Sequence, residues 1–299
     1  MKIILYCLVF VTIFSSSCKP GSADPNLIKP VFSTYVTKEK PKENKPGKNI
    51  IFYGVLTPVE ICAIFDRLGV PYDQAALNPP SNRDYYLSSS KTAINTGVYG
   101  VDFGYLKMFG IGQEMLNYIM TIREMCFNLG IPESIITVPI DNIQSSISDP
   151  DTIMVMVNTA YSLMDEHLRL TGRESTAGLI LMGGWVEAMF ISTQLVYDPL
   201  NPDPEVIQRI AEQKYILTTL LSMMKNYYDD PVVVYYSKKL KYLQKYFDSF
   251  DIYYRKGDLE IDLANQLLRS TGSEMTITIE TLNLIRDYVN KLRTEMVTP

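Results

Sequence analysis

The segment from Ser175 to Tyr197 constrains the fold most strongly, because it is apolar nearly all the way round a helix. A helix with one apolar face can lie on a surface, but a helix that is apolar on every side has to be covered by other elements. We interpret the run around Gly183-Gly184 as too short and too interrupted for a transmembrane helix. The segment therefore predicts a central helix enclosed by others.

Other parts of the chain repeat apolar residues at intervals of three and four, which is the spacing of one helix face. Proline, glycine and capping residues separate these stretches, and a capping box at Thr57-Pro58-Val59-Glu60 begins a helix that ends at Gly69. The expected helices are Leu87 to Met108, Gln113 to Leu129, Asp151 to Leu170, Asp203 to Tyr227, Asp230 to Phe250, Leu259 to Leu268 and Thr278 to Met296. Strand-like alternation is confined to Met275–Ile279 and Asn49–Tyr53. The chain is predicted to be all-α, a multi-helix bundle of antiparallel helix pairs around a central apolar helix.

A row of small residues marks the helix from Leu87 to Met108: Ala93, Gly97, Gly100 and Gly104. Each glycine costs a helix about 1 kcal/mol relative to alanine, so the row needs a physical reason. The favoured reason is close approach of the helix that carries Gly183 and Gly184. The alternatives are a break in the helix, or a ligand on bare backbone contacting Gly97, Tyr99, Gly100, Asp102 and Gly104.

Glu187 is a carboxylate inside the most apolar helix, where it is costly unless it is paired or protonated. We expect it to reach the helix edge or to pair with an arginine such as Arg123 or Arg169. The alternative is a carboxylate of raised pKa that shares a pocket with Asp102. Such a pair could serve a hydrolase or lyase, as in glycoside hydrolysis.

His167 is the only histidine, and this count excludes most histidine-based catalysis and zinc chemistry. The spacing favours a hydrogen-bonded core histidine over a ligand-binding one, and we predict neither a metal site nor a cofactor. The stripe on which it falls consists of Ile153, Met156, Ala160, Leu163, His167 and Leu170.

The first residues have the features of a secretory signal: a positive start at Lys2, an apolar run from Ile3 to Phe14, and small residues before Cys18. Such a run is too short to span a bilayer. Ser15-Ser16-Ser17-Cys18 resembles the lipobox of bacterial lipoproteins, although Ser15 stands where leucine is usual. The resemblance implies cleavage before Cys18 and acylation of its thiol. The alternative is an ordinary secreted protein.

Composition changes after Cys18, because residues 19–48 are rich in proline, lysine and glutamate and lack an apolar period. We therefore divide the chain into a signal peptide (1–17), a lipidated cysteine with a flexible tether (18–48) and a single all-helical domain (49–299). With a net charge of −5, nucleic acid is not expected as a partner. Cys62 and Cys126 are expected as buried thiols, with a disulfide as the alternative.

Adjacent tyrosine pairs recur along the helices, among them Tyr227-Tyr228 and Tyr235-Tyr236. Neighbouring residues on a helix point about 100° apart. One ring of a pair can therefore enter the core while the next faces solvent or a partner. The favoured role is helix packing, and the alternative is a contact surface for proteins or sugars.

Several segments resemble a family of predicted lipoproteins from Bacteroidetes whose helical domain has no assigned function. The matching segments are Thr57–Glu60 with Leu68–Tyr72, Ala93–Gly104, and Met182–Glu187. The resemblance implies a membrane-tethered helical domain and brings no reaction or cofactor with it.

Together these features favour a non-enzymatic envelope lipoprotein that binds a protein partner or a small ligand. We expect it to be exported and lipid-anchored to the outer membrane. The periplasmic side is favoured because Lys19-Pro20-Gly21-Ser22, rather than acidic residues, follows the cysteine. The alternatives are a hydrolase or lyase with a pocket carboxylate pair, and a glycan-binding surface lipoprotein. The last is disfavoured because the chain has one tryptophan, Trp185, in its most apolar helix.

Overall fold

The computed structural model describes residues 27–28, 70–136, 150–255, 259–262, 267–270 and 274–298. The chain divides into two compact units: Met1–Pro30 with Tyr253–Glu274, and Val31–Ile252 with Met275–Pro299. The predicted helix that begins at Thr57, the predicted strand Asn49–Tyr53, and both Cys18 and Cys62 lie outside the described residues.

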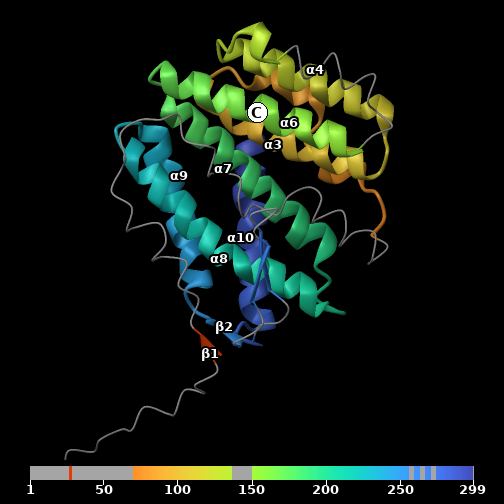
Figure 1. Cartoon of the computed structure of the whole chain (residues 1–299), viewed down its shortest axis with the longest axis vertical. Helices are drawn as coiled ribbons and strands as arrows, with labels where there is room; N and C mark the ends of the chain where they lie inside the picture. Colours follow the sequence, from red (N-terminus) through yellow and green to blue (C-terminus); the bar gives the residue numbers. More distant parts are fainter. Residues whose placement is uncertain are drawn as a thin grey trace, which may run out of the picture. The chain divides into compact units, whose positions relative to one another are not determined.

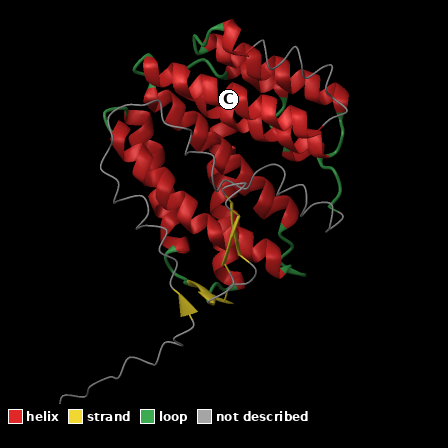
Figure 2. Ribbon diagram, viewed as in Figure 1, coloured by secondary structure: helices red, strands yellow, loops and turns green. Residues whose placement is uncertain are grey.

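Helices make up most of the larger unit, so the predicted all-α class is confirmed (Figure 2). The α-helices are α3 (Ser89–Met108), α4 (Gly112–Asn128), α6 (Pro150–Leu170), α7 (Glu174–Ile191), α8 (Pro204–Met224), α9 (Pro231–Phe247) and α10 (Ile279–Val297). Short helical turns connect them: η1 (Gln74–Ala76), η2 (Pro80–Tyr85), η3 (Ser192–Val196, a π-type turn) and η4 (Lys225–Tyr227).

The ends of these helices follow the capping residues in the sequence. Asp203 and Asp230 accept hydrogen bonds from the first backbone amides of α8 and α9, and a proline follows each of them. Glycines in the left-handed region lie two residues beyond the ends of α4 and α6, with φ of 68° at Gly130 and 69° at Gly172.

Helix α7 occupies the centre of the larger unit, as its all-round apolar sequence predicts. It contacts α3, α6, α8, α9 and α10, and Figure 1 shows α3 and α6 above it and α8 and α9 below it. Contrary to the expectation from sequence, Glu174–Val196 is long and apolar enough to cross a membrane, and it is the single such helix among the described residues. Because 78% of its apolar window is buried inside the protein, it serves here as the core helix.

Glycines allow α3 and α7 to approach almost backbone to backbone. A Cβ added at Gly97 would lie 1.9 Å from the carbonyl oxygen of Ile180. A Cβ at Gly183 would lie 2.0 Å from that of Ile94. The predicted close approach of these two helices is confirmed, and α3 is continuous, so the alternative of a broken helix is wrong.

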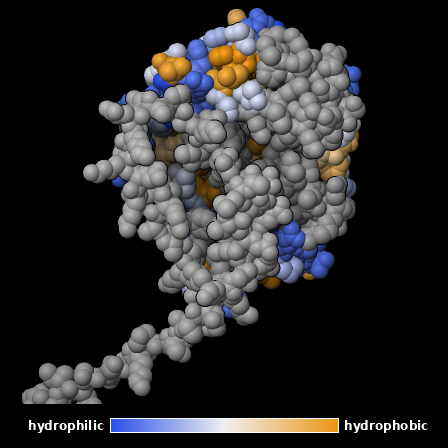
Figure 3. Space-filling model, viewed as in Figure 1, coloured by the Kyte–Doolittle hydropathy of each residue, from blue (hydrophilic) through white to orange (hydrophobic). Residues whose placement is uncertain are grey.

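The face of α6 that packs inward differs from the predicted stripe. Met164 and Leu168 are buried, whereas Leu163 and Leu170 are 40% and 79% exposed and His167 is half-buried. Figure 3 shows hydrophobic residues at the surface beside hydrophilic ones at the top of the molecule, the part in which Figure 1 labels α4 and α6. Apolar residues occupy more than one face of α6, so spacing alone could not select the buried one.

Short strands complete the described structure, and they correct one predicted helix. The strands are β1 (Leu27–Ile28), β2 (Ile252–Arg255), β3 (Leu259–Asp262), β4 (Leu267–Ser270) and β5 (Glu274–Met275). One sheet has the order β1-β2-β5, and β3 pairs antiparallel with β4, Leu259 opposite Ser270. The helix predicted over Leu259–Leu268 is therefore wrong. Leu259 and Ile261 alternate with Glu260 and Asp262 in the sequence, which is a strand pattern.

Candidate functional site

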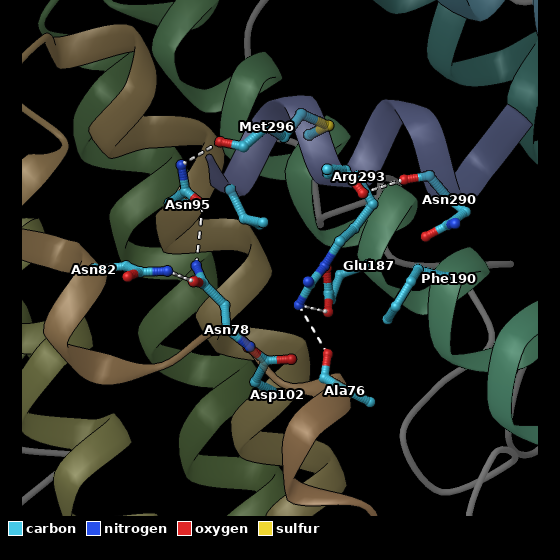
Figure 4. A network of polar contacts seen from close by, with 12 residues as sticks. Ala76, Asn78, Asn82, Asn95, Asp102, Glu187, Phe190, Asn290, Arg293 and Met296 are labelled. Atoms are coloured by element: carbon cyan, nitrogen blue, oxygen red, sulfur yellow. Dashed lines mark hydrogen bonds and ion pairs between the residues drawn. The ribbon is translucent and has the colours of Figure 1, made fainter. Parts of the chain in front are cut away.

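Four polar residues from distant parts of the sequence meet inside the larger unit. Asn78 lies between η1 and η2, Asp102 on α3, Glu187 on α7 and Arg293 on α10. We call these four residues the polar seam (Figure 4). Asn78, Asp102 and Glu187 are each 0% exposed, and the Arg293 side chain is 11% exposed. Because α3 and α7 meet at glycines, a carboxylic acid on each helix can take part in one buried cluster.

Glu187 and Arg293 form a two-pronged ion pair. Nε of Arg293 lies 2.9 Å from Oε2 of Glu187, and Nη2 lies 3.0 Å from Oε1. Nη2 also donates to the carbonyl oxygen of Ala76 at 2.9 Å, and the guanidinium lies 4.5 Å from the ring centroid of Phe190. Pairing of this kind satisfies a buried carboxylate with both charge and hydrogen bonds.

The predicted partners of Glu187 were wrong. Arg123 pairs with Glu133, and Arg169 pairs with Asp165 at 2.7 Å. Arg293 could have been recognised as a candidate, because it lies on the apolar stripe of its helix, four residues after Val289 and three before Met296. A cation on an otherwise apolar helix face needs a buried partner.

Asp102 is the remaining member of the seam. Its Oδ2 accepts a hydrogen bond from the backbone amide of Asn78 at 3.1 Å, while its buried Oδ1 receives none from any described residue. Burial raises the pKa of Asp102 well above its usual value, and the negative charge of Glu187 raises it further, against the opposing effect of Arg293. The surroundings of Asp102 therefore favour its protonated form.

Asn78 connects the seam to α3, α4 and η2. Its Nδ2 donates to Oδ1 of Asn95 at 3.2 Å, and its Oδ1 accepts from Nδ2 of Asn82 at 2.9 Å. Its carbonyl oxygen accepts from the Tyr118 hydroxyl at 3.0 Å. A residue between two short helical turns is thus fixed by side chains from three elements.

The C-terminal end of α10 is held by residues on and just before α3. Nζ of Lys91 donates to the carbonyl oxygen of Thr298 at 2.6 Å, and Nδ2 of Asn95 donates to that of Met296 at 3.0 Å. The Tyr86 hydroxyl donates to the carbonyl oxygen of Val297 at 2.8 Å. These carbonyl groups have no partner within the helix, so the contacts satisfy them and fix the turn that carries Arg293.

The remaining candidate residues have packing contacts of their own. Tyr99 is 0% exposed, and its hydroxyl donates to the carbonyl oxygen of Pro79 at 2.8 Å. Gly97 and Gly104 are buried, and a Cβ at Gly100 would lie 1.6 Å from the hydroxyl oxygen of Tyr161. His167 belongs to α6 and takes no part in the seam. The glycine row is therefore covered by α7 at Gly97 and by the Tyr161 ring at Gly100.

A small, partly open groove lies along α6, α7 and α8, and it is separate from the seam. Its lining is largely apolar and includes Met164, Leu168, Ala177, Ile180 and Met223, together with the ion-paired Asp165 and Arg169. Neither Asp102 nor Glu187 lines it.

Other reactive groups give no second centre in the part of the chain that the structure describes. Cys126 is a free, buried thiol, and burial raises its pKa to about 12, so it is not a ready nucleophile. No group of three histidine, cysteine, aspartate or glutamate side chains among these residues is placed to hold a metal ion.

The seam has the character of an internal support. A general acid or base must reach the atom whose proton it moves, and such sites are concave. Both acids are instead enclosed: Arg293 binds the two oxygens of Glu187, and the Asn78 amide binds Oδ2 of Asp102. Comparisons of the chain with family models, with curated proteins and with solved structures find no match, so a function has to be inferred from the residues themselves.

Proposed function

We propose that this chain is an exported envelope lipoprotein, anchored by an acylated Cys18 to the periplasmic side of a bacterial outer membrane. Its helical unit is a non-catalytic module that binds another envelope protein or a small ligand. The observation that carries the non-catalytic part is the complete burial of Asp102 and Glu187 against Arg293.

Support for the anchor comes from the N-terminal sequence. Lys2, the apolar run Ile3–Phe14 and Ser15-Ser16-Ser17-Cys18 have the order that a lipoprotein signal requires. Several acyl chains on one residue bind a bilayer stably, because each buried methylene contributes about 0.8 kcal/mol. The apolar helix α7 is not needed for attachment, since it forms the core of the larger unit.

Support for a non-catalytic module comes from the enclosure of the two acids and from the partners of three of their four oxygens. In glycoside hydrolysis the carboxyl groups flank the scissile bond and one of them contacts water or the sugar. Here Arg293 binds both oxygens of Glu187, and the Asn78 amide binds Oδ2 of Asp102. A substrate could reach either acid only after α3, α7 and α10 separated.

The anchor is tested by expressing the full chain in a bacterium and partitioning the cell extract into detergent and aqueous phases. The parent protein should enter the detergent phase, and mass spectrometry should show an acylated N-terminal Cys18. Cys18→Ala should not be acylated. Cys7→Ala is the matched control: it should behave as the parent, because Cys7 is removed with the leader. An unmodified Cys18 with the leader still attached would contradict the proposal.

The binding role is tested by affinity capture of the full chain from envelope extracts, with mass spectrometry of both proteins and small molecules. A partner enriched equally by the parent and by Asp102→Asn supports the proposal, because this substitution keeps the seam's hydrogen bonds while removing its acid. Turnover of any captured compound that Asp102→Asn abolishes at an unchanged melting temperature would favour the hydrolase or lyase instead.

A further inference from the structure

The charged side chains of helix α9 are all positive, although the chain as a whole is acidic. Between Pro231 and Phe247 there are four lysines and neither aspartate nor glutamate, although the whole chain has a net charge of −5. The exposed residues at three- and four-residue spacings form one outer face, which we call the α9 stripe: Tyr235, Lys238, Lys241, Tyr242 and Lys245. Tyr235 and Tyr242 are 49% and 48% exposed.

The opposite face of α9 fixes the direction of this stripe. Val233, Leu240, Leu243 and Phe247 are each 0% exposed and pack into the core. Rotating the helix to hide the stripe would expose these side chains, at a cost of about 1.5–3 kcal/mol for each one. From position 235 to position 245 the stripe is about 15 Å long.

Aromatic rings from α9 and α10 make the stripe wider and hold Tyr242 in place. Tyr242 stacks on Tyr288 of α10 with centroids 5.1 Å apart, and the edge of Tyr246 meets both rings at 5.7 Å and 6.1 Å. The Tyr288 hydroxyl donates to the carbonyl oxygen of Lys239 at 3.1 Å.

The lysines of the stripe lack carboxylate partners within the described part of the chain. Lys239, which lies beside the stripe, pairs with Glu295 at 2.6 Å. Lys245 and Lys241 instead lie 5.2 Å and 5.3 Å from the ring centroids of Tyr242 and Tyr228. These ammonium groups therefore remain available to an anionic surface.

We infer that the α9 stripe is the surface with which the helical unit lies on an anionic lipid bilayer. Tyrosine is enriched at the membrane–water interface, where the lipid head groups lie. Lysine extends its ammonium group to the phosphates while its methylene groups contact apolar surface. Each lysine near an anionic leaflet strengthens association about fivefold. The inference rests on the proposed function in one respect, because the anchor at Cys18 is what brings the unit close to a bilayer.

A bilayer fits the stripe better than a small ligand does. The groove among the described residues is lined by residues of α6, α7 and α8, and the stripe contributes nothing to it. Basic side chains are attracted to an anionic leaflet and tyrosines favour the membrane–water interface, so a row that combines them suits a membrane surface.

The test measures quenching of tryptophan fluorescence by a lipid-bound quencher, to which the chain's single tryptophan should contribute little. Trp185 is 1% exposed, so Tyr242→Trp in the full chain adds an indole that reports from the stripe. The sample is mixed with excess vesicles of phosphatidylcholine that carry a nitroxide quencher, with or without phosphatidylglycerol. Phe127→Trp is the matched control, because Phe127 is 72% exposed on α4, which carries no part of the stripe. The indole at position 242 should be quenched when phosphatidylglycerol is present, and the indole at position 127 should not.

Charge reversal at Lys238, Lys241 and Lys245 (each →Glu) in the Tyr242→Trp chain should remove this quenching. Three lysines at about fivefold each correspond to roughly a hundredfold in local association, before the repulsion of the new carboxylates is counted. High salt should act in the same direction, because it screens exposed charges.

Flotation of the same samples separates the two proposals. A chain that floats while the indole at position 242 stays unquenched would overturn the role of the stripe and leave the anchor intact. A chain that does not float but is quenched with phosphatidylglycerol would contradict the anchor and support the stripe. Absence of both signals would overturn both, and equal quenching at positions 127 and 242 would overturn the stripe. An anionic polysaccharide or a protein as the true partner would give the first of these results.

Discussion

The polar seam and the α9 stripe both place charged residues on helices, yet they solve opposite problems. In the seam the charges of Glu187 and Arg293 are buried, of opposite sign and joined by two hydrogen bonds. In the stripe they are exposed, of one sign and free of ion pairs among the described residues. The difference shows that a charged residue in an unexpected place can indicate an internal support as readily as a functional site.

The energetic contrast follows from the surroundings of each charge. A buried ion is costly once its partner is removed, because nothing replaces the lost hydration. An exposed charge keeps its water and contributes little to the free energy of unfolding. The seam should therefore respond to single substitutions through stability, and the stripe should respond through binding.

The largest loss of stability is expected at the close contact between α3 and α7, which brings Asp102 and Glu187 into the seam. Gly183→Ala places a Cβ 2.0 Å from the carbonyl oxygen of Ile94, a backbone atom that cannot move without the helix. We expect a loss of about 5 kcal/mol or more, at the exceptional end for one substitution. Urea unfolding measures it.

Gly184→Ala is the matched control for this contact. Its added Cβ would meet atoms at 3.4 Å and beyond, which is ordinary contact. Because alanine favours a helix by about 1 kcal/mol over glycine, this variant should be neutral or slightly more stable. Similar losses for the two variants would contradict a backbone contact at Gly183.

The next effect concerns the ion pair itself. Glu187→Gln leaves the guanidinium of Arg293 buried without a counter-charge, and this should lower the free energy of unfolding by about 3–5 kcal/mol. Glu133→Gln breaks the surface pair with Arg123, in which the glutamate side chain is 65% exposed, and should cost less than about 1 kcal/mol. Equal losses in thermal unfolding would show that Glu187 is not desolvated as described.

A smaller effect should depend on pH through Asp102. Its folded pKa is raised, so the folded chain binds one proton more than the unfolded chain between about pH 4 and the folded pKa. The contribution of protonated Asp102 to the free energy of unfolding is fully present below that pH window, and it is lost as the pH rises through the window.

Asp102→Asn keeps a donor towards Glu187 and an acceptor for the Asn78 amide without the titration. Within this pH window, the free energy of unfolding of the variant should rise relative to that of the parent by about 1.4 kcal/mol for each pH unit of increase. Urea unfolding at a series of pH values measures the difference. Parallel profiles for the two proteins would show that Asp102 is already ionised.

The smallest effect on stability is expected in the stripe. Replacing Lys238, Lys241 and Lys245 by glutamine removes exposed charges that have no ion pairs among the described residues, so each change should stay within about 0.5 kcal/mol. Unfolding midpoints close to that of the parent, together with weaker contact with anionic vesicles, would sharpen the contrast with the seam. A marked loss of stability would mean that these lysines support the fold.

Much of the fold could be predicted because it depends on local pattern. The central position of α7 follows from its all-round apolar sequence, and the glycine row of α3 indicated a helix neighbour. The predicted buried face of α6 was wrong by one position. Apolar residues lie on both faces of this helix, and the structure buries Met164 and Leu168 rather than Leu163 and Leu170. The strand β3 was missed because its alternation is only four residues long.

The candidate site was predictable only in part. Asp102 and Glu187 could be named together, because a carboxylic acid in apolar surroundings needs a partner. The partner itself, Arg293, lies 106 residues from Glu187 in the chain. The basic face of α9 was also missed, because its lysines are spread over helical turns and do not form a run in the sequence.

The sequence by itself determined the positions of α3, α4 and α6 to α10, which helix lies at the centre, and that two buried acids require compensation. These properties depend on spacing, capping and hydration, all of which act within a few residues. Only the tertiary structure decided that Arg293 supplies the counter-charge for Glu187, and that both acids are closed off from solvent. Both depend on which distant helices meet, and that is settled by packing over the whole core.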